Sequence, residues 1–80
     1  MADRDPIADL RRIAFLLERA HESTYRVRAF RSAAGALAGR RDDLVSLAAS
    51  GELKKIRGVG EVTARTVTES LAGVEPEYLR

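Results

Sequence analysis

The sequence predicts a small all-α protein, a bundle of four to five helices that ends in two helices joined by a tight glycine-containing hairpin. Apolar residues recur at spacings of three and four along most of the chain, which is the period of a helix with one buried face. No segment alternates apolar and polar residues with an enrichment in β-branched side chains, so strands are not expected. A chain of 80 residues has room for one compact core. We therefore expect one helical domain over residues 1–73 and a tail or linker over residues 74–80.

The first helix is expected over residues 6–20. Asp5 can cap its N-terminus, and Pro6 at the first helical position loses no hydrogen bond that the helix would make. An apolar stripe, widened by its last three members, is formed by Ile7, Leu10, Ala14, Leu17, Ile13, Phe15 and Leu16.

The second helix is expected from Ser23 or Thr24 to about residue 38, with Gly39 ending it. Its buried face is expected to carry Val27, Phe30, Ala33, Ala34 and Leu37, and its opposite face Arg28, Arg31, Ser32 and Gly35. Asp42 or Asp43 can cap a short third helix that Gly51 ends.

The last third of the chain combines a very short helical segment, a glycine turn and one longer helix. Residues 52–56 are long enough for little more than one helical turn, and a Gly-Val-Gly turn follows. A further helix is expected over residues 61–72, with Ala64, Val67 and Leu71 on its buried face. Residues 74–80 contain Pro76 and have no clear partner, so this segment is interpreted as a tail or as a linker to a downstream domain.

Composition excludes several function classes. Without cysteine the chain has no disulfide, no thiolate nucleophile and no cysteine-held zinc or iron–sulfur cluster. One histidine, His21, is too few for a multi-histidine metal site or a catalytic triad. Apolar runs are short and the start does not read as a signal peptide, so a soluble cytoplasmic protein is expected.

Basic charge is concentrated in two stretches. Residues 23–41 carry five arginines and no acidic residue, and residues 52–66 also carry an excess of basic side chains, although the whole chain has a net charge of only +2. This distribution is typical of a surface that binds nucleic acid. A solvated, arginine-rich helical surface is the alternative interpretation.

The Gly-Val-Gly turn is the segment that points to binding. Gly58 and Gly60 allow close approach of a ligand to the backbone, and the turn leads into a helix whose first amides have no internal partner. A phosphate could be held by N–H groups around residues 58–62, with Val59 pointing into the core. Nearby positive charge would come from Lys54, Lys55, Arg57 and Arg65. The alternative is a tight turn that binds nothing.

Two patterns carry a family resemblance. Leu53-x-x-Ile56-x-Gly58-Val59-Gly60-x-x-x-Ala64-x-x-Val67 resembles the helix-hairpin-helix motif of DNA-binding proteins that do not read sequence. Together with Tyr25-Arg26-Val27-Arg28-Ala29-Phe30-Arg31, residues 6–73 resemble the amino-terminal domain of bacterial X-family DNA polymerases, which is similar to the lyase domain of DNA polymerase beta. The module also resembles the N-terminal part of proteins that carry a PHP-type phosphoesterase domain downstream, some of which are histidinol-phosphatase-like.

The resemblance implies a set of binding residues. It places Gly58, Val59 and Gly60 at a DNA phosphate. It implies a monovalent cation on the main-chain carbonyls of Arg57, Val59 and Val62, and no other cofactor. Its 5′-phosphate pocket would fall on Arg26, Phe30 and Arg31, with Phe30 itself expected in the core. The candidate phosphate-binding set is Gly58, Val59, Gly60, Lys54, Lys55, Arg57, Arg65, Arg26, Arg28 and Arg31.

The lyase reaction of the resembled family is not expected by its usual route. That reaction needs a lysine amine to form a Schiff base, and the corresponding positions here are Thr66 and Val62. The chain has only Lys54 and Lys55, which would have to reach an abasic sugar from another direction. No catalytic residue is therefore predicted.

The sequence thus predicts a monomeric module that binds the DNA backbone, including gapped or 5′-phosphate ends. The resemblance implies that it serves as the N-terminal part of a larger X-family polymerase-like or PHP-type protein. The alternative is a docking or scaffold domain of a PHP-type phosphoesterase that has lost DNA binding. Glu61 favours that alternative, because it places a carboxylate next to the proposed phosphate.

Overall fold

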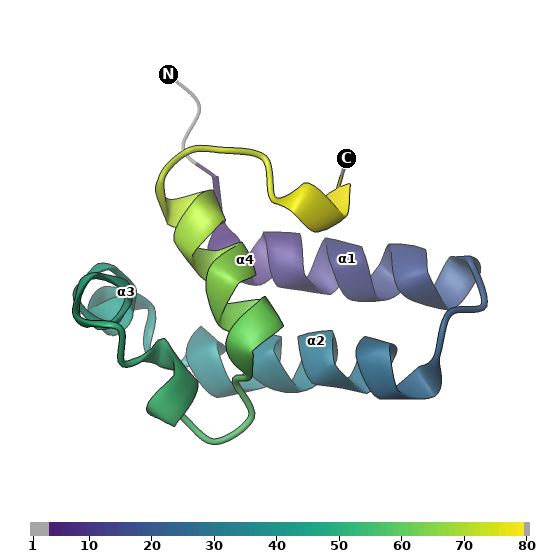
Figure 1. Cartoon of the computed structure of the whole chain (residues 1–80), viewed down its shortest axis with the longest axis horizontal. Coiled ribbons are helices and arrows are strands. Elements are labelled where there is room, and N and C mark those ends of the chain that lie inside the picture. The colour runs from purple at the N-terminus through teal and green to yellow at the C-terminus, as the bar shows by residue number, and fades with distance from the viewer. Residues whose placement is uncertain (1–3, 80) are drawn as a thin grey trace.

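A computed structural model describes residues 4–79 and confirms an all-α fold (Figure 1). Within this range there are no strands. The four α-helices are α1 (Pro6–Arg19), α2 (Thr24–Ala38), α3 (Leu44–Ser50) and α4 (Glu61–Leu71). The three short 3₁₀ turns are η1 (Arg41–Asp43), η2 (Leu53–Lys55) and η3 (Glu77–Leu79). The first three residues of the predicted domain and the last residue of the predicted tail lie outside the described range.

Helix α1 begins as its sequence predicts. The Asp5 carboxylate accepts hydrogen bonds from the N–H groups of Ile7 and Ala8, at 3.0 and 3.3 Å, and Pro6 occupies the first turn. The same carboxylate accepts a bond of 2.9 Å from the Arg41 guanidinium. This contact, opposed by partial burial and supported by the two amides, lowers the pKa of Asp5. The cap therefore also ties α1 to the segment that follows α2.

Helices α1 and α2 lie side by side and antiparallel, and α4 crosses them (Figure 1). The predicted stripes supply most of the core. Its fully or almost fully buried members are Ile7, Leu10, Ile13, Ala14, Phe30, Ala33, Ala34, Leu37, Leu44, Leu53, Val59, Ala64 and Val67.

The expectation that Phe15 and Leu16 belong to the apolar face of α1 is wrong. Both side chains are exposed, because the stripe through Ile7, Leu10 and Ala14 already faces the neighbouring helices. The Arg19 guanidinium instead lies over the Phe15 ring, 5.6 Å from the ring centroid, in a cation–π contact.

Helix α3 differs at its start from the expected cap. Asp43 occupies the N-cap position, but its carboxylate makes no capping hydrogen bond and lies 3.6 Å from the Arg40 guanidinium. The preceding turn η1 continues almost directly into α3, which leaves little room for a capping geometry. Gly51 ends α3 in the left-handed region, with φ of 73°, as its type suggests.

A buried polar contact joins the first helix to the last. The Ser70 hydroxyl donates to the Asp9 carboxylate at 2.7 Å, and the Arg4 guanidinium donates to the same carboxylate at 3.0 Å. Burying a carboxylate is costly unless it is paired and hydrogen-bonded, and here both conditions are met. The contact fixes the end of α4 against the start of α1.

Residues 74–79 have partners that the sequence does not suggest. This segment folds back along α1 (Figure 1), Pro76 is buried, and the Tyr78 ring lies 5.1 Å from the Phe30 ring. The expectation of a segment without a clear partner is therefore wrong for residues 76–79, because Pro76 is buried, Tyr78 contacts Phe30 and Leu79 packs against the core. Whether the segment also connects to another domain stays a prediction.

Candidate nucleic-acid interface

The turn between η2 and α4 lies against α2 at its first glycine. Gly58 has φ of 97°, a region that side chains with a Cβ rarely adopt. A Cβ on it would also lie 3.4 Å from the Ser32 carbonyl oxygen and 3.5 Å from the Ala36 Cβ. Gly58 is therefore favoured by its positive φ, whereas the distances to α2 are ordinary van der Waals contacts that a Cβ would tolerate.

Val59 and Gly60 have different roles in the same turn. Val59 is buried, as predicted, and its N–H donates to the Ile56 carbonyl at 3.0 Å. Gly60 has φ of −104° and ψ of −174°, which any residue adopts, and a Cβ built on it meets nothing within 4 Å. The fold thus has no need of a glycine at position 60, and its missing side chain leaves open space in front of α4.

The amides available to an anion are fewer than the sequence predicts. The Gly60 N–H already donates to the Thr63 hydroxyl oxygen at 2.9 Å, and the Val59 N–H is bonded within the turn. The N–H groups of Glu61, Val62 and Thr63 have no acceptor among residues 4–79. They form the N-terminal end of α4, where the helix dipole adds partial positive charge.

A shallow groove runs between this turn and the start of α2. We call it the hairpin groove, and its lining residues are Tyr25, Arg28, Ala29, Ser32, Gly58, Val59, Gly60, Glu61, Val62 and Thr63. Arg28 is exposed and forms no ion pair with any other described residue. Tyr25 is 83 % exposed. The groove therefore joins the free amides at the start of α4 to one unpaired cation.

The other predicted cations of α2 lie elsewhere. The Arg31 guanidinium donates to Glu18 on α1 at 2.8 Å, and that of Arg26 lies 3.8 Å from Glu22. Arg28 and Arg31 line one further cavity, which Glu18 and Glu22 also line, and Arg26 is not part of it. Only Arg28 faces the hairpin groove.

The basic residues around η2 divide in a similar way. Lys55 lies 3.7 Å from Glu52, whereas Arg57 is exposed and has no ion-pair partner in the described part of the chain. Lys54 lines a second cavity together with Glu61 and Arg65. Lys54, Arg57 and Arg28 are thus the cations that surround the turn without an acidic partner at ion-pair distance.

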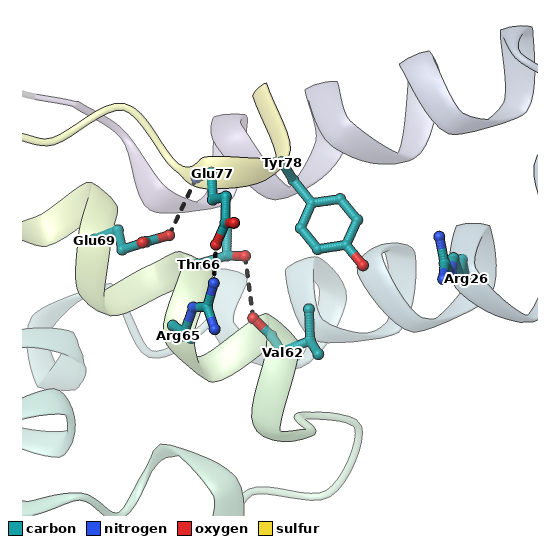
Figure 2. Close-up of a pocket in the computed structure, with 7 residues that line it drawn as sticks. All are labelled: Arg26, Val62, Arg65, Thr66, Glu69, Glu77 and Tyr78. Carbon is teal, nitrogen blue, oxygen red and sulfur yellow. Dashed lines mark hydrogen bonds and ion pairs between the residues drawn. The ribbon is translucent and has the colours of Figure 1, made fainter. Parts of the chain in front are cut away.

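A cluster of charged side chains lies under the folded-back segment rather than at the turn. We call this cavity the tail pocket, and it is lined by Arg26, Val62, Arg65, Thr66, Glu69, Glu77 and Tyr78 (Figure 2). Its cations are matched by two carboxylates, and Arg65 donates directly to Glu77. The pocket is therefore close to neutral, and no lysine lines it.

Thr66 and Val62 occupy the positions that correspond to lysines in the lyase family. Thr66 is 2 % exposed, and its hydroxyl donates to the Val62 carbonyl at 3.1 Å. A buried hydroxyl in this arrangement offers no amine to an aldehyde. The same bond engages the Val62 carbonyl, one of the three predicted cation ligands, and the cation site itself stays a prediction. No cluster of His, Cys, Asp or Glu able to hold a metal occurs among residues 4–79.

A helical bundle in which a Gly-Val-Gly turn joins the short 3₁₀ helix η2 to α4 has the layout of a helix-hairpin-helix protein. The sequence model of the helix-hairpin-helix domain family matches residues 1–75, so the chain belongs to this family. Domains of this family generally bind DNA without sequence specificity. No significant match was found among curated proteins or solved structures. Every helix of the described range is too short or too polar to cross a bilayer.

Proposed function

We propose that this domain binds the DNA backbone at the hairpin groove, without reading base sequence. The amides of Glu61 and Val62 would hold one phosphate, and Arg28 would contact a neighbouring phosphate. The observation that carries this proposal is Gly60, a glycine that the fold does not require and that stands where a ligand must approach these amides.

Charge supports the same surface. Arg28, Arg57 and Lys54 surround the turn and have no ion-pair partner within residues 4–79, so a phosphate would not have to displace a carboxylate from them. Binding that rests on such contacts releases counterions, and its affinity falls steeply with salt.

Gapped duplex DNA is the proposed substrate form, on the strength of the resemblance to X-family polymerase domains. The 5′-phosphate is expected to add little, because Arg26 shares the tail pocket with Glu69 and Glu77 and Arg31 is paired with Glu18. We likewise infer that the domain serves a larger polymerase-like or PHP-type protein and has no lyase activity through Thr66.

The test is fluorescence anisotropy of a labelled gapped duplex over a salt series, with and without the 5′-phosphate. Arg28→Gln should flatten the plot of log affinity against log salt by about 0.9, the loss of one phosphate contact. Arg31→Gln is the matched control, since it removes the same charge from the same helix, and it should change the slope much less because Arg31 is held by Glu18.

Equal slopes for these two variants would contradict the proposed surface. Absence of binding at low salt by a folded wild-type domain would contradict DNA binding altogether. Docking to another protein domain is the second candidate function, and it is favoured by Glu61, whose exposed carboxylate lines the hairpin groove beside the free amides. Measured affinity for a PHP-type domain without affinity for DNA would support it.

A further inference from the structure

Arg65 lies between two cavities on α4. On one side it lines the tail pocket with Glu77, and on the other it lines the cavity next to the hairpin with Lys54 and Glu61. It follows Glu61 by four residues, which places both side chains on the same side of the helix, one turn apart. A long, flexible arginine side chain at this position can reach either the tail or the hairpin.

The structure holds this side chain on the tail side. The Arg65 Nη2 donates to the Glu77 carboxylate, and the Glu77 N–H donates to the Glu69 carboxylate at 3.3 Å (Figure 2). The side chains of Arg65 and Glu77 are 65 % and 61 % exposed. An ion pair so open to water is weak, so a phosphate can compete with it.

The position of Glu77 does not depend on this ion pair. Pro76 is buried, Leu79 packs on the core and the Tyr78 ring contacts Phe30, so apolar contacts hold residues 76–79 in place. We call these four residues the tail latch. It presents a carboxylate to Arg65 at a defined point on the surface.

We propose that the tail latch restrains DNA binding by keeping Arg65 paired to Glu77 and away from the hairpin. The proposal rests on the proposed function, because it concerns the affinity of the same DNA-binding surface. When the pair opens, Arg65 joins Lys54 and Arg57 on the hairpin side and adds one phosphate contact. The DNA affinity of the domain is then set by the state of this segment as well as by the groove.

The experiment compares Glu77→Gln with Asp42→Asn in the anisotropy assay. Asp42 is exposed and forms no ion pair with another described residue, so its variant measures the general effect of removing one negative charge. Glu77→Gln should raise the affinity about two- to fivefold beyond Asp42→Asn at low salt. It should also steepen the salt slope by about 0.9. In an Arg65→Gln background the extra gain should disappear.

Three results would overturn the proposal. Glu77→Gln could behave as Asp42→Asn does, or its extra gain could persist in the Arg65→Gln background. If the wild-type protein binds DNA, either of these two results contradicts the tail-latch proposal and leaves the proposed function intact. If neither the wild type nor Glu77→Gln binds DNA, the proposed function and the latch fail together. Circular dichroism of each variant verifies that the helices are retained.

Discussion

The hairpin groove and the tail pocket contain similar side chains in opposite states. Each has a tyrosine, at least one arginine from α2 and at least one glutamate from α4 or beyond it. In the groove, Tyr25 is 83 % exposed and Arg28 has no ion-pair partner among the described residues. In the pocket, Tyr78 packs on Phe30 and Arg65 is bonded to Glu77.

The difference shows that pairing, rather than residue type, separates a surface able to bind a polyanion from one that is internally satisfied. An arginine that already contacts a carboxylate must lose that contact before it can bind a phosphate, whereas an unpaired arginine exchanges only water and counterions. The proposed DNA binding therefore falls on the groove, and the proposed restraint falls on the pocket.

The largest effect on stability is expected at the turn itself. Gly58→Ala forces a Cβ into a conformation with φ of 97°. The free energy of unfolding should fall by about 1–3 kcal/mol. Urea denaturation measures it. A variant as stable as the wild type would show that the turn does not hold Gly58 at this positive φ.

The two tyrosines provide the next comparison. Tyr78→Ala removes a ring that packs on Phe30 and should lower the free energy of unfolding by about 1 kcal/mol. Tyr25→Ala removes an exposed ring and should change it by less than about 0.5 kcal/mol. Thermal melts of both variants test this order, and an equal loss for both would remove the structural distinction between the two regions.

A cap far from both regions gives a control for stability alone. Asp5→Ala should cost about 1 kcal/mol at pH 7, since Asp5 caps α1, without reducing DNA affinity. The folded protein lowers the pKa of Asp5, so this contribution is complete above the ordinary value of 3.8 and is lost as pH falls through the lower folded value. Wild type and variant should thus converge in acid, and Asp5→Asn, which keeps the cap, should lose less.

Much of the fold could be predicted because it depends on local patterns. The caps at Asp5 and Ser23, the stops at Gly39 and Gly51 and the burial of Val59 all follow from nearby residues. Phe15 and Leu16 are expected in the core because they lie next to the apolar stripe of α1. Their exposure depends on which side of α1 the neighbouring helices cover, which periodicity does not encode.

The candidate site was less predictable because its state depends on contacts between distant residues. Arg31 is paired to Glu18, thirteen positions away, and Arg65 to Glu77, twelve positions away. The sequence does not indicate these ion-pair partners. It therefore cannot show which arginines near the motif are free to bind a phosphate. The tail latch is unpredictable for the same reason, since Tyr78 packs on Phe30, which belongs to α2 and lies far earlier in the chain.

The most direct test of the central claim is Gly60→Ser, measured for both DNA affinity and thermal stability. Serine suits the backbone at this N-cap position, so the melting temperature should stay close to that of the wild type. Its side chain would occupy the open space before the Glu61 and Val62 amides, so the affinity for a gapped duplex should fall about tenfold or more, a loss comparable to one strong charge-assisted hydrogen bond. Unchanged affinity in a folded Gly60→Ser protein would contradict phosphate binding at this turn.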